Sequence, residues 1–345
     1  MENKNFTYDD ILVLESGDSL HGFQLNYSTL GKLNEDKSNV IWVCHALTAN
    51  SDVATWWDGM VGEGKLYDPN KHFIICANII SSCYGSTGPL HINPLTHKKY
   101  YLDFPTVTIR DMVAALNIFR KHLGISKIHS LVGGSLGGQQ AMEWAIIEPD
   151  LIENLILLAT NAQHSPWGIA WNESQRMAIA ADTTWGEERD DAGQAGLRAA
   201  RSIALISYRN YEAYHKTQSD TDIEKTDHYK AQSYQQYQGE KLVQRFNVYS
   251  YWYLTKAMDS HHVGRGRGGV KNALAKIKAK TIVIGIVSDV LFPVSEQITL
   301  AKLIPNGTYV EIDSFYGHDG FLIETKEITS ILIDFYTKNT QTISL

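Results

Sequence analysis

The stretch Leu131–Trp144, which reads LVGGSLGGQQAMEW, constrains the fold of this chain more than any other. An apolar run ends at Val132, a helical pattern follows Ser135, and Gly133–Gly137 between them matches G-x-S-x-G. In this motif the serine occupies a sharp strand-to-helix turn, and its neighbours are small because the backbone segments approach closely. The turn exposes the hydroxyl above a sheet and points the amides of the next helix toward it. This arrangement is typical of a serine that attacks acyl groups.

Short apolar runs before and after this motif predict a parallel sheet, because they alternate with stretches of helical spacing. Ile11–Tyr27 alternates apolar and polar residues around a Gly-Asp turn and predicts an antiparallel hairpin at one edge. We therefore predict an α/β fold with a mostly parallel central sheet, helices on both faces and a helical lid insert. The core takes residues 1–170 and 272–345, and the insert takes residues 171–271. The predicted strands are Val40–Cys44, Phe73–Ala77, Ile128–Val132, Leu155–Leu158, Thr281–Val287 and Tyr309–Ile312, and helices are predicted at Thr106–Leu123 and Ser295–Leu303.

Composition excludes several classes of protein. The 345 residues carry a net charge of −7, which argues against nucleic-acid binding, and the Arg-Gly loop Gly264–Gly269 is too short to change that. We see no signal peptide and no run of 18 apolar residues, so we expect a cytoplasmic protein without a membrane span. Three cysteines are too few for a disulfide framework. The adjacent pair His261-His262 has no accompanying ligand cluster, so we expect no metal.

A serine nucleophile needs a base and an acid, and in this type of fold they follow it in the order acid, then histidine. Asp289 comes directly after the predicted strand Thr281–Val287. Downstream of Asp289 the chain contains one histidine, His318, in a loop after the last predicted strand. We therefore predict that Ser135 is the nucleophile, His318 the general base and then acid, and Asp289 the residue that orients the imidazole.

Acyl transfer also needs hydrogen-bond donors for the oxyanion. The backbone N–H of Leu136, the residue after the nucleophile, is one predicted donor. The loop His45-Ala-Leu-Thr48 follows an early strand, and we predict Leu47 as the second donor. We expect His45 itself to make a local hydrogen bond and to have no catalytic role.

Several longer motifs resemble the homoserine O-acetyltransferases, which are α/β-hydrolase-fold enzymes of methionine biosynthesis. The resemblance runs from about Ile11 to the final helix. The matching segments are His45–Thr48, Trp56–Asp58, Cys83–Pro89, Ile92–Pro94, Phe104–Asp111, Gly133–Gln139 and Gly317–Asp319.

The resemblance implies a reaction and further site residues. It implies ping-pong transfer of acetyl from acetyl-CoA, a co-substrate, to the γ-hydroxyl of L-homoserine through acetylated Ser135, with no bound cofactor. By the same match, Arg201 and Tyr208 in the insert bind substrate, and Asp319 binds the homoserine amino group. An arginine can grip a carboxylate bidentately, so this pairing suits an amino-acid acceptor. The resemblance also implies a homodimer formed through the insert, for which Tyr249–Tyr253 is one source of apolar contact area.

The chain departs from the family pattern at Ile79–Ser82, where two glycines are common, and this loop is expected to reshape the acyl pocket. The sequence leaves three alternatives open: succinyl-CoA as the donor, L-serine as the acceptor, and simple ester hydrolysis. A difference of one methylene in the acceptor is worth only about 1–3 kcal/mol, so sequence does not separate the acceptors.

Overall fold

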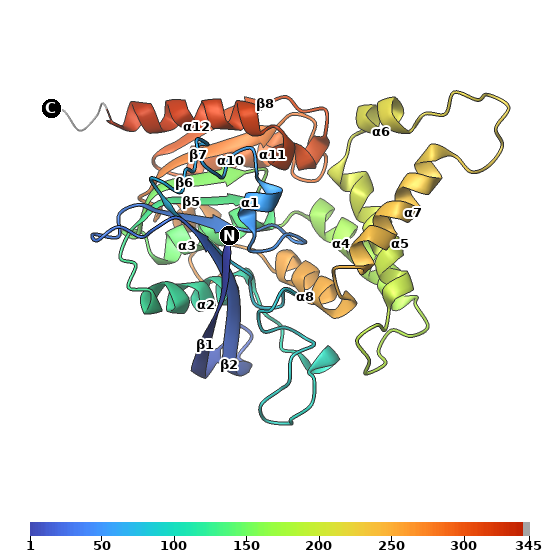
Figure 1. Cartoon of the computed structure of the whole chain (residues 1–345), viewed down its shortest axis with the longest axis horizontal. Coiled ribbons are helices and arrows are strands. Elements are labelled where there is room, and N and C mark those ends of the chain that lie inside the picture. Colours follow the sequence, from blue (N-terminus) through green and yellow to red (C-terminus); the bar gives the residue numbers. More distant parts are fainter. Residues whose placement is uncertain (341–345) are drawn as a thin grey trace.

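The computed structural model describes residues 1–340, so the last five residues of the predicted core segment 272–345 lie outside the described part. One eight-stranded sheet runs through this part in the order β1-β2-β4-β3-β5-β6-β7-β8. The pairs β1–β2 and β2–β4 are antiparallel, and the remaining neighbours are parallel (Figure 1). This confirms the mostly parallel sheet. The strands are β1 (Glu2–Val13), β2 (Ser19–Leu30), β3 (Val40–Cys44), β4 (Phe73–Ala77), β5 (Ile128–Gly134), β6 (Ile152–Leu158), β7 (Lys280–Ile286) and β8 (Gly307–Ile312).

Helices cover both faces of the sheet and so create two hydrophobic cores. Successive strand residues point to opposite faces, so Trp42 packs against Trp144 on one side, while Val43 belongs to the core on the other side that also contains Leu332. Because both faces are covered, β3 is buried at all five positions. The helices are α1 (Val53–Trp56), α2 (Ile109–His122), α3 (Leu136–Ile147), α4 (Pro166–Ala180), α5 (Gln194–Tyr208), α6 (Tyr211–Gln218), α7 (Lys230–Val243), α8 (Val248–Asp259), α9 (Val270–Leu274), α10 (Val294–Leu303), α11 (Gly320–Ile323) and α12 (Thr325–Thr340), with short 3₁₀ turns at Tyr101–Asp103 and Gly317–Asp319.

Between β6 and β7 the chain forms only helices, α4 to α9, in the part that the structure describes. Helices α4 to α8 stand together to one side of the sheet (Figure 1). Since α4 begins at Pro166 and α9 ends at Leu274, the boundaries predicted at 171 and 271 fall inside or next to helices, and the division into core and insert stays a prediction. No helix within residues 1–340 is both long enough and apolar enough to cross a membrane.

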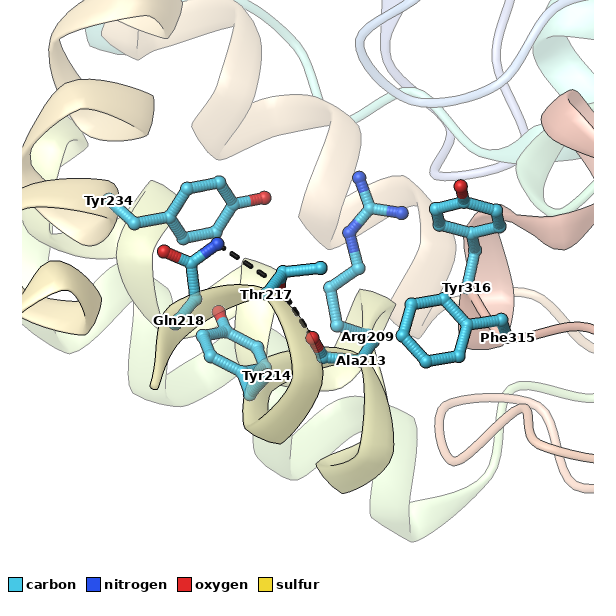
Figure 2. A pocket seen from close by; sticks show the side chains of 8 residues that line it. All are labelled: Arg209, Ala213, Tyr214, Thr217, Gln218, Tyr234, Phe315 and Tyr316. Atoms are coloured by element: carbon cyan, nitrogen blue, oxygen red, sulfur yellow. Dashed lines mark hydrogen bonds between the residues drawn. The ribbon is translucent and has the colours of Figure 1, made fainter. Parts of the chain in front are cut away.

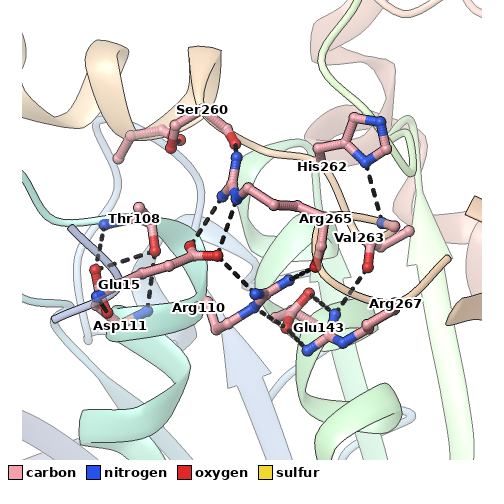
Figure 3. Close-up of polar contacts among 12 residues, drawn as sticks. Glu15, Thr108, Arg110, Asp111, Glu143, Ser260, His262, Val263, Arg265 and Arg267 are labelled. Carbon is pink, nitrogen blue, oxygen red and sulfur yellow. Dashed lines mark hydrogen bonds and ion pairs between the residues drawn. The ribbon is translucent and has the colours of Figure 1, made fainter. Parts of the chain in front are cut away.

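A cluster of five charged side chains, the root cluster, fixes the chain where it returns from these helices to the sheet (Figure 3). Arg110 in α2 binds Glu15 at 2.6 Å and Glu143 of α3 at 3.0 Å. Arg265 binds Glu15 at 2.9 Å, and Arg267 binds Glu143. The Arg-Gly loop of the sequence therefore serves as a clamp between the insert, the first hairpin and the helix that follows Ser135.

Candidate active site

Ser135 sits at the turn between β5 and α3, as the sequence predicts. Its backbone has φ 56° and ψ −126°, a conformation that costs free energy for a residue with a side chain. The turn is possible because its neighbours are glycines. A Cβ on Gly133 would lie 2.1 Å from the Gly137 carbonyl oxygen, and a Cβ on Gly137 would lie 2.1 Å from the Cys44 carbonyl oxygen.

The structure brings the three predicted triad side chains into one hydrogen-bonded chain. His318 Nε2 lies 2.9 Å from Ser135 Oγ, and His318 Nδ1 lies 2.6 Å from Asp289 Oδ2. The other oxygen of Asp289 accepts hydrogen bonds from the amides of Leu291 and Phe292, at 2.8 and 2.9 Å. The carboxylate is therefore held in place by its own loop and aimed at the imidazole.

The environment of His318 makes it basic although it is buried. Burial alone lowers the pKa of an imidazole, but the charge and hydrogen bond of Asp289 outweigh burial and raise the pKa of His318 above its usual value. Phe292 stacks on the ring at 5.1 Å between centroids, and Phe321 meets its edge at 5.4 Å. These contacts hold the imidazole ring in the orientation that places Nε2 next to the Ser135 hydroxyl.

The loop after β3 lies against the first turn of α3, which brings both predicted oxyanion donors to the same region. Leu136 is the first residue of α3, and Leu47 lines a cavity together with Ser135. Gln140 Nε2 donates to the carbonyl oxygens of His45 and Leu136, at 3.1 and 3.3 Å, and so ties the loop to the helix. The arrangement suits a pair of amide donors on one side of the nucleophile.

The cavity beside Ser135, about 530 Å³ in volume, also holds the three predicted substrate-binding residues Arg201, Tyr208 and Asp319. Arg201 stacks on Tyr208, with its guanidinium carbon 5.3 Å from the ring centroid. Its Nη1 is buried without a hydrogen-bond partner within residues 1–340. The insert thus presents an unsatisfied cation, and the loop of His318 presents a carboxylate, to the space that the nucleophile faces.

Comparison with known proteins identifies the family. A family model described as the alpha/beta hydrolase fold matches residues 39–325. A homoserine O-acetyltransferase of Cyclobacterium marinum is 51% identical over 339 residues, which cover 98% of this chain and 96% of that protein. The chain belongs to the homoserine O-acetyltransferase family. This confirms the predicted α/β-hydrolase fold and the resemblance.

Solved structures agree with the family assignment. The homoserine O-acetyltransferase of Bacillus anthracis superposes with a TM-score of 0.86 at 26% identity, over 96% of this chain and 97% of that one. An acetylester hydrolase of Corynebacterium glutamicum superposes with a TM-score of 0.82 at 26% identity, over 94% and 91% of the two chains. The same architecture therefore occurs in a transferase and in a hydrolase, so the overall fold does not determine which acceptor the cavity binds.

Arg209 was not predicted as a site residue from the sequence. In the structure it contacts the carboxylate of Asp319, the predicted partner of the homoserine amino group. Its Nη1 is 3.2 Å from Asp319 Oδ2, and its guanidinium lies over the ring of Tyr316. Figure 2 shows the Arg209 side chain beside Tyr316, and both line a smaller cavity of about 170 Å³. The family match marks Arg201, and no comparable sequence signal marks Arg209, whose contact with Asp319 depends on its position directly after α5.

The departure from the family pattern at Ile79–Ser82 lies beneath the site. Ser81 has φ 78°, a left-handed conformation that favours glycine, and its buried hydroxyl has no hydrogen-bond partner in the described part. The amide of Ile79 donates to His45 Nε2 at 3.2 Å. Within the described residues, none of the four in this segment lines the 530 Å³ cavity, so the expected reshaping of the acyl pocket is not direct.

Proposed function

We propose that this protein transfers an acetyl group from acetyl-CoA to the γ-hydroxyl of L-homoserine by a ping-pong route, in methionine biosynthesis. One observation carries the proposal: the cavity that contains Ser135 and His318 also contains an unsatisfied arginine, Arg201, and a carboxylate, Asp319. An amino acid carries one negative and one positive group, so this pair suits an amino-acid acceptor better than an uncharged alcohol or water.

The first half-reaction forms the acetyl-enzyme. Ser135 Oγ attacks the thioester carbonyl while its proton passes to His318 Nε2, and the imidazolium is stabilised by Asp289. The amides of Leu47 and Leu136 hold the oxyanion of the tetrahedral intermediate. The carbon–sulfur bond then breaks, and the thiol leaves with the proton of His318.

The second half-reaction reverses these roles with a different alcohol. The homoserine hydroxyl gives its proton to His318 and attacks the acetyl carbonyl, and Ser135 leaves after regaining a proton. Arg201 binds the acceptor carboxylate, with Tyr208 supporting the guanidinium, and Asp319 binds the amino group. A positioned hydroxyl outcompetes water because orientation is worth up to about 7–11 kcal/mol in intramolecular reactions.

A thiol-release assay tests the proposal. Acetyl-, succinyl- and propionyl-CoA are each supplied with homoserine, with serine or with no acceptor. We expect the fastest release with acetyl-CoA and homoserine and slow release without an acceptor. Fast release that does not depend on homoserine would establish a hydrolase instead.

Two variants in α5 test the acceptor site. Arg201→Gln removes the proposed carboxylate partner, and we expect KM for homoserine to rise about 10- to 150-fold, the range for hydrogen bonds to charged groups. Arg198→Gln is the matched control, because Arg198 in the same helix pairs with Glu240 at 2.6 Å and does not line the cavity. Equal effects of the two substitutions would remove Arg201 from the binding site.

The homodimer and the cytoplasmic location are also proposals. The tyrosines of Tyr249–Tyr253 are buried within this chain and leave no free area for a partner. Exposed apolar side chains elsewhere on the insert support association through it: Met177, Ile206, Tyr211 and Tyr237. Light scattering on the purified protein gives the oligomeric state, and cell fractionation gives the location.

A further inference from the structure

Two cations line the active-site cavity at the end of α7. Lys241 lies in the last turn of this helix, and Arg245 follows two residues after the helix ends at Val243. Both side chains are exposed, and both line the cavity that contains Ser135. The cavity therefore opens past a pair of positive charges on the insert.

No carboxylate of residues 1–340 lies within ion-pair distance of either cation. Arg245 Nη1 donates to the Thr48 carbonyl oxygen and to the Tyr84 hydroxyl, both at 2.6 Å and both uncharged. Glu240, the neighbour of Lys241, is bound to Arg198 instead. The whole chain has a net charge of −7, so its composition does not explain why Lys241 and Arg245 line the same cavity without a carboxylate partner.

The acceptor does not account for these charges. An amino acid that binds Arg201 and Asp319 is itself neutral, and it leaves Lys241 and Arg245 opposed among the lining residues only by Asp52. Asp52 accepts a hydrogen bond from Thr55 at 2.6 Å, at the start of α1. The charged lining residues that the acceptor does not use therefore have a net positive charge, which suits a second ligand that is negatively charged.

We propose that Lys241 and Arg245 form a binding site for the phosphate groups of the acyl donor. The inference rests on the proposed function, in which that donor is acetyl-CoA. Arg245 is bound to Thr48, the residue after Leu47, so the site adjoins the loop that holds the thioester carbonyl. Phosphates bound there hold the carrier arm along the cavity and direct the leaving thiol toward the opening.

Donors that differ only in their phosphates test the site. For Lys241→Met, kcat/KM is measured with acetyl-CoA and with S-acetylpantetheine, which has the same thiol arm and no phosphate. We expect the preference for acetyl-CoA to fall about three- to tenfold, and Lys241→Glu to lower it further. The control is Lys256→Met, since Lys256 is an exposed cation of the insert that does not line the cavity; it should keep the wild-type preference.

Binding without turnover separates this inference from the proposed function. Calorimetry measures the Kd of CoA and of pantetheine for Ser135→Ala and for Ser135→Ala combined with Lys241→Met. A three- to tenfold weaker Kd for CoA alone supports the phosphate site, even if no acetyl transfer to homoserine is found. Unchanged CoA affinity, or equal losses for CoA and pantetheine, overturns the site while leaving the transfer reaction intact.

Discussion

The loop of His318 and the loop of His45 both border the active site, and each contains a buried histidine, yet the pKa values of the two rings are shifted in opposite directions. His45 is 0% exposed and His318 is 4% exposed. Burial lowers the pKa of His45 to about 4, whereas Asp289 reverses the effect of burial at His318 and raises its pKa. A buried carboxylate partner, and not burial itself, distinguishes a histidine that can exchange a proton from one that stays neutral.

The hydrogen bonds of the two rings show what each state is used for. His45 Nε2 accepts from the amide of Ile79, so Nδ1 carries the proton and donates to the Ala46 carbonyl oxygen at 2.9 Å. Both ring nitrogens are thus committed to backbone groups beside Leu47. His318 commits only Nδ1, to Asp289, and its Nε2 is available to the Ser135 hydroxyl. The first ring fixes a loop, and the second ring is placed to accept the Ser135 proton in the proposed reaction.

Replacing the carboxylate should produce the largest effect. Asp289→Asn removes the charge that raises the pKa of His318 and favours the wrong tautomer, so we expect kcat for thiol release to fall about 10⁴-fold. Circular dichroism confirms that the variant is folded. A loss of less than tenfold would show that His318 does not depend on Asp289.

The pH dependence of the wild-type enzyme sharpens the comparison. Protonated His318 cannot accept the Ser135 proton, and its pKa is raised, so kcat/KM should fall on the acid side about an apparent pKa above 6.5, the usual histidine value. Below that point the decline should be about tenfold per pH unit. A decline on the acid side centred below pH 6.5 would mean that the charge of Asp289 does not raise the pKa of His318.

Removing the hydrogen bonds of His45 should affect stability more than chemistry. His45→Phe leaves the Ile79 amide unsatisfied, and we expect about 1–3 kcal/mol less stability in urea at neutral pH.

In the wild type, the unfolded chain binds a proton at this position between pH 6.5 and about 4 while folded His45 stays neutral, so stability falls as pH drops through this window. This contribution is about 3 kcal/mol and should be missing from the variant. His21→Phe, at an exposed position of β2, is the control and should leave the pH dependence unchanged.

The smallest expected effect lies in the loop that His45 binds. Ser81→Gly removes a left-handed serine and an unpartnered buried hydroxyl, so we expect about 1 kcal/mol more stability in urea. Ser82→Gly is the matched control. Ser82 is outside the left-handed region, and its hydroxyl accepts from the Tyr84 amide at 3.4 Å, so this change should destabilise the protein. The opposite order would show that Ser81 is not strained.

The sequence predicts a structural element well where one local property of its residues determines that element. β3 and β4 have their predicted bounds because strands covered on both faces are apolar throughout. β1 begins at Glu2, well before the predicted start at Ile11, because an edge strand is mostly exposed and its polar residues carry no apolar pattern. The triad could be predicted because chain order restricts the acid and the base to loops after particular strands.

The contacts made by the insert could not be predicted in this way. Lys241 reaches the site from the last turn of α7 and Arg245 from the segment after it, while Arg209 reaches Asp319 from the end of α5. These positions depend on packing between helices that no spacing in the sequence encodes. The backbone conformation of Ser81 is equally hidden, because serine does not indicate a left-handed turn. These features depend on long-range contacts and appear only in the folded chain.

The root cluster also has a consequence for the order of assembly. Glu15 and Arg265, which bind each other, are separated by 250 residues, whereas the contacts of Arg110 with Glu15 and Glu143 span 95 and 33 residues. During synthesis, Arg110 is therefore the one arginine of the root cluster available to Glu15 and Glu143 until Arg265 and Arg267 at the end of the insert have been made. The two carboxylates of the root cluster therefore gain their remaining arginine partners only when the chain leaves the insert, before β7 and β8 have been synthesised.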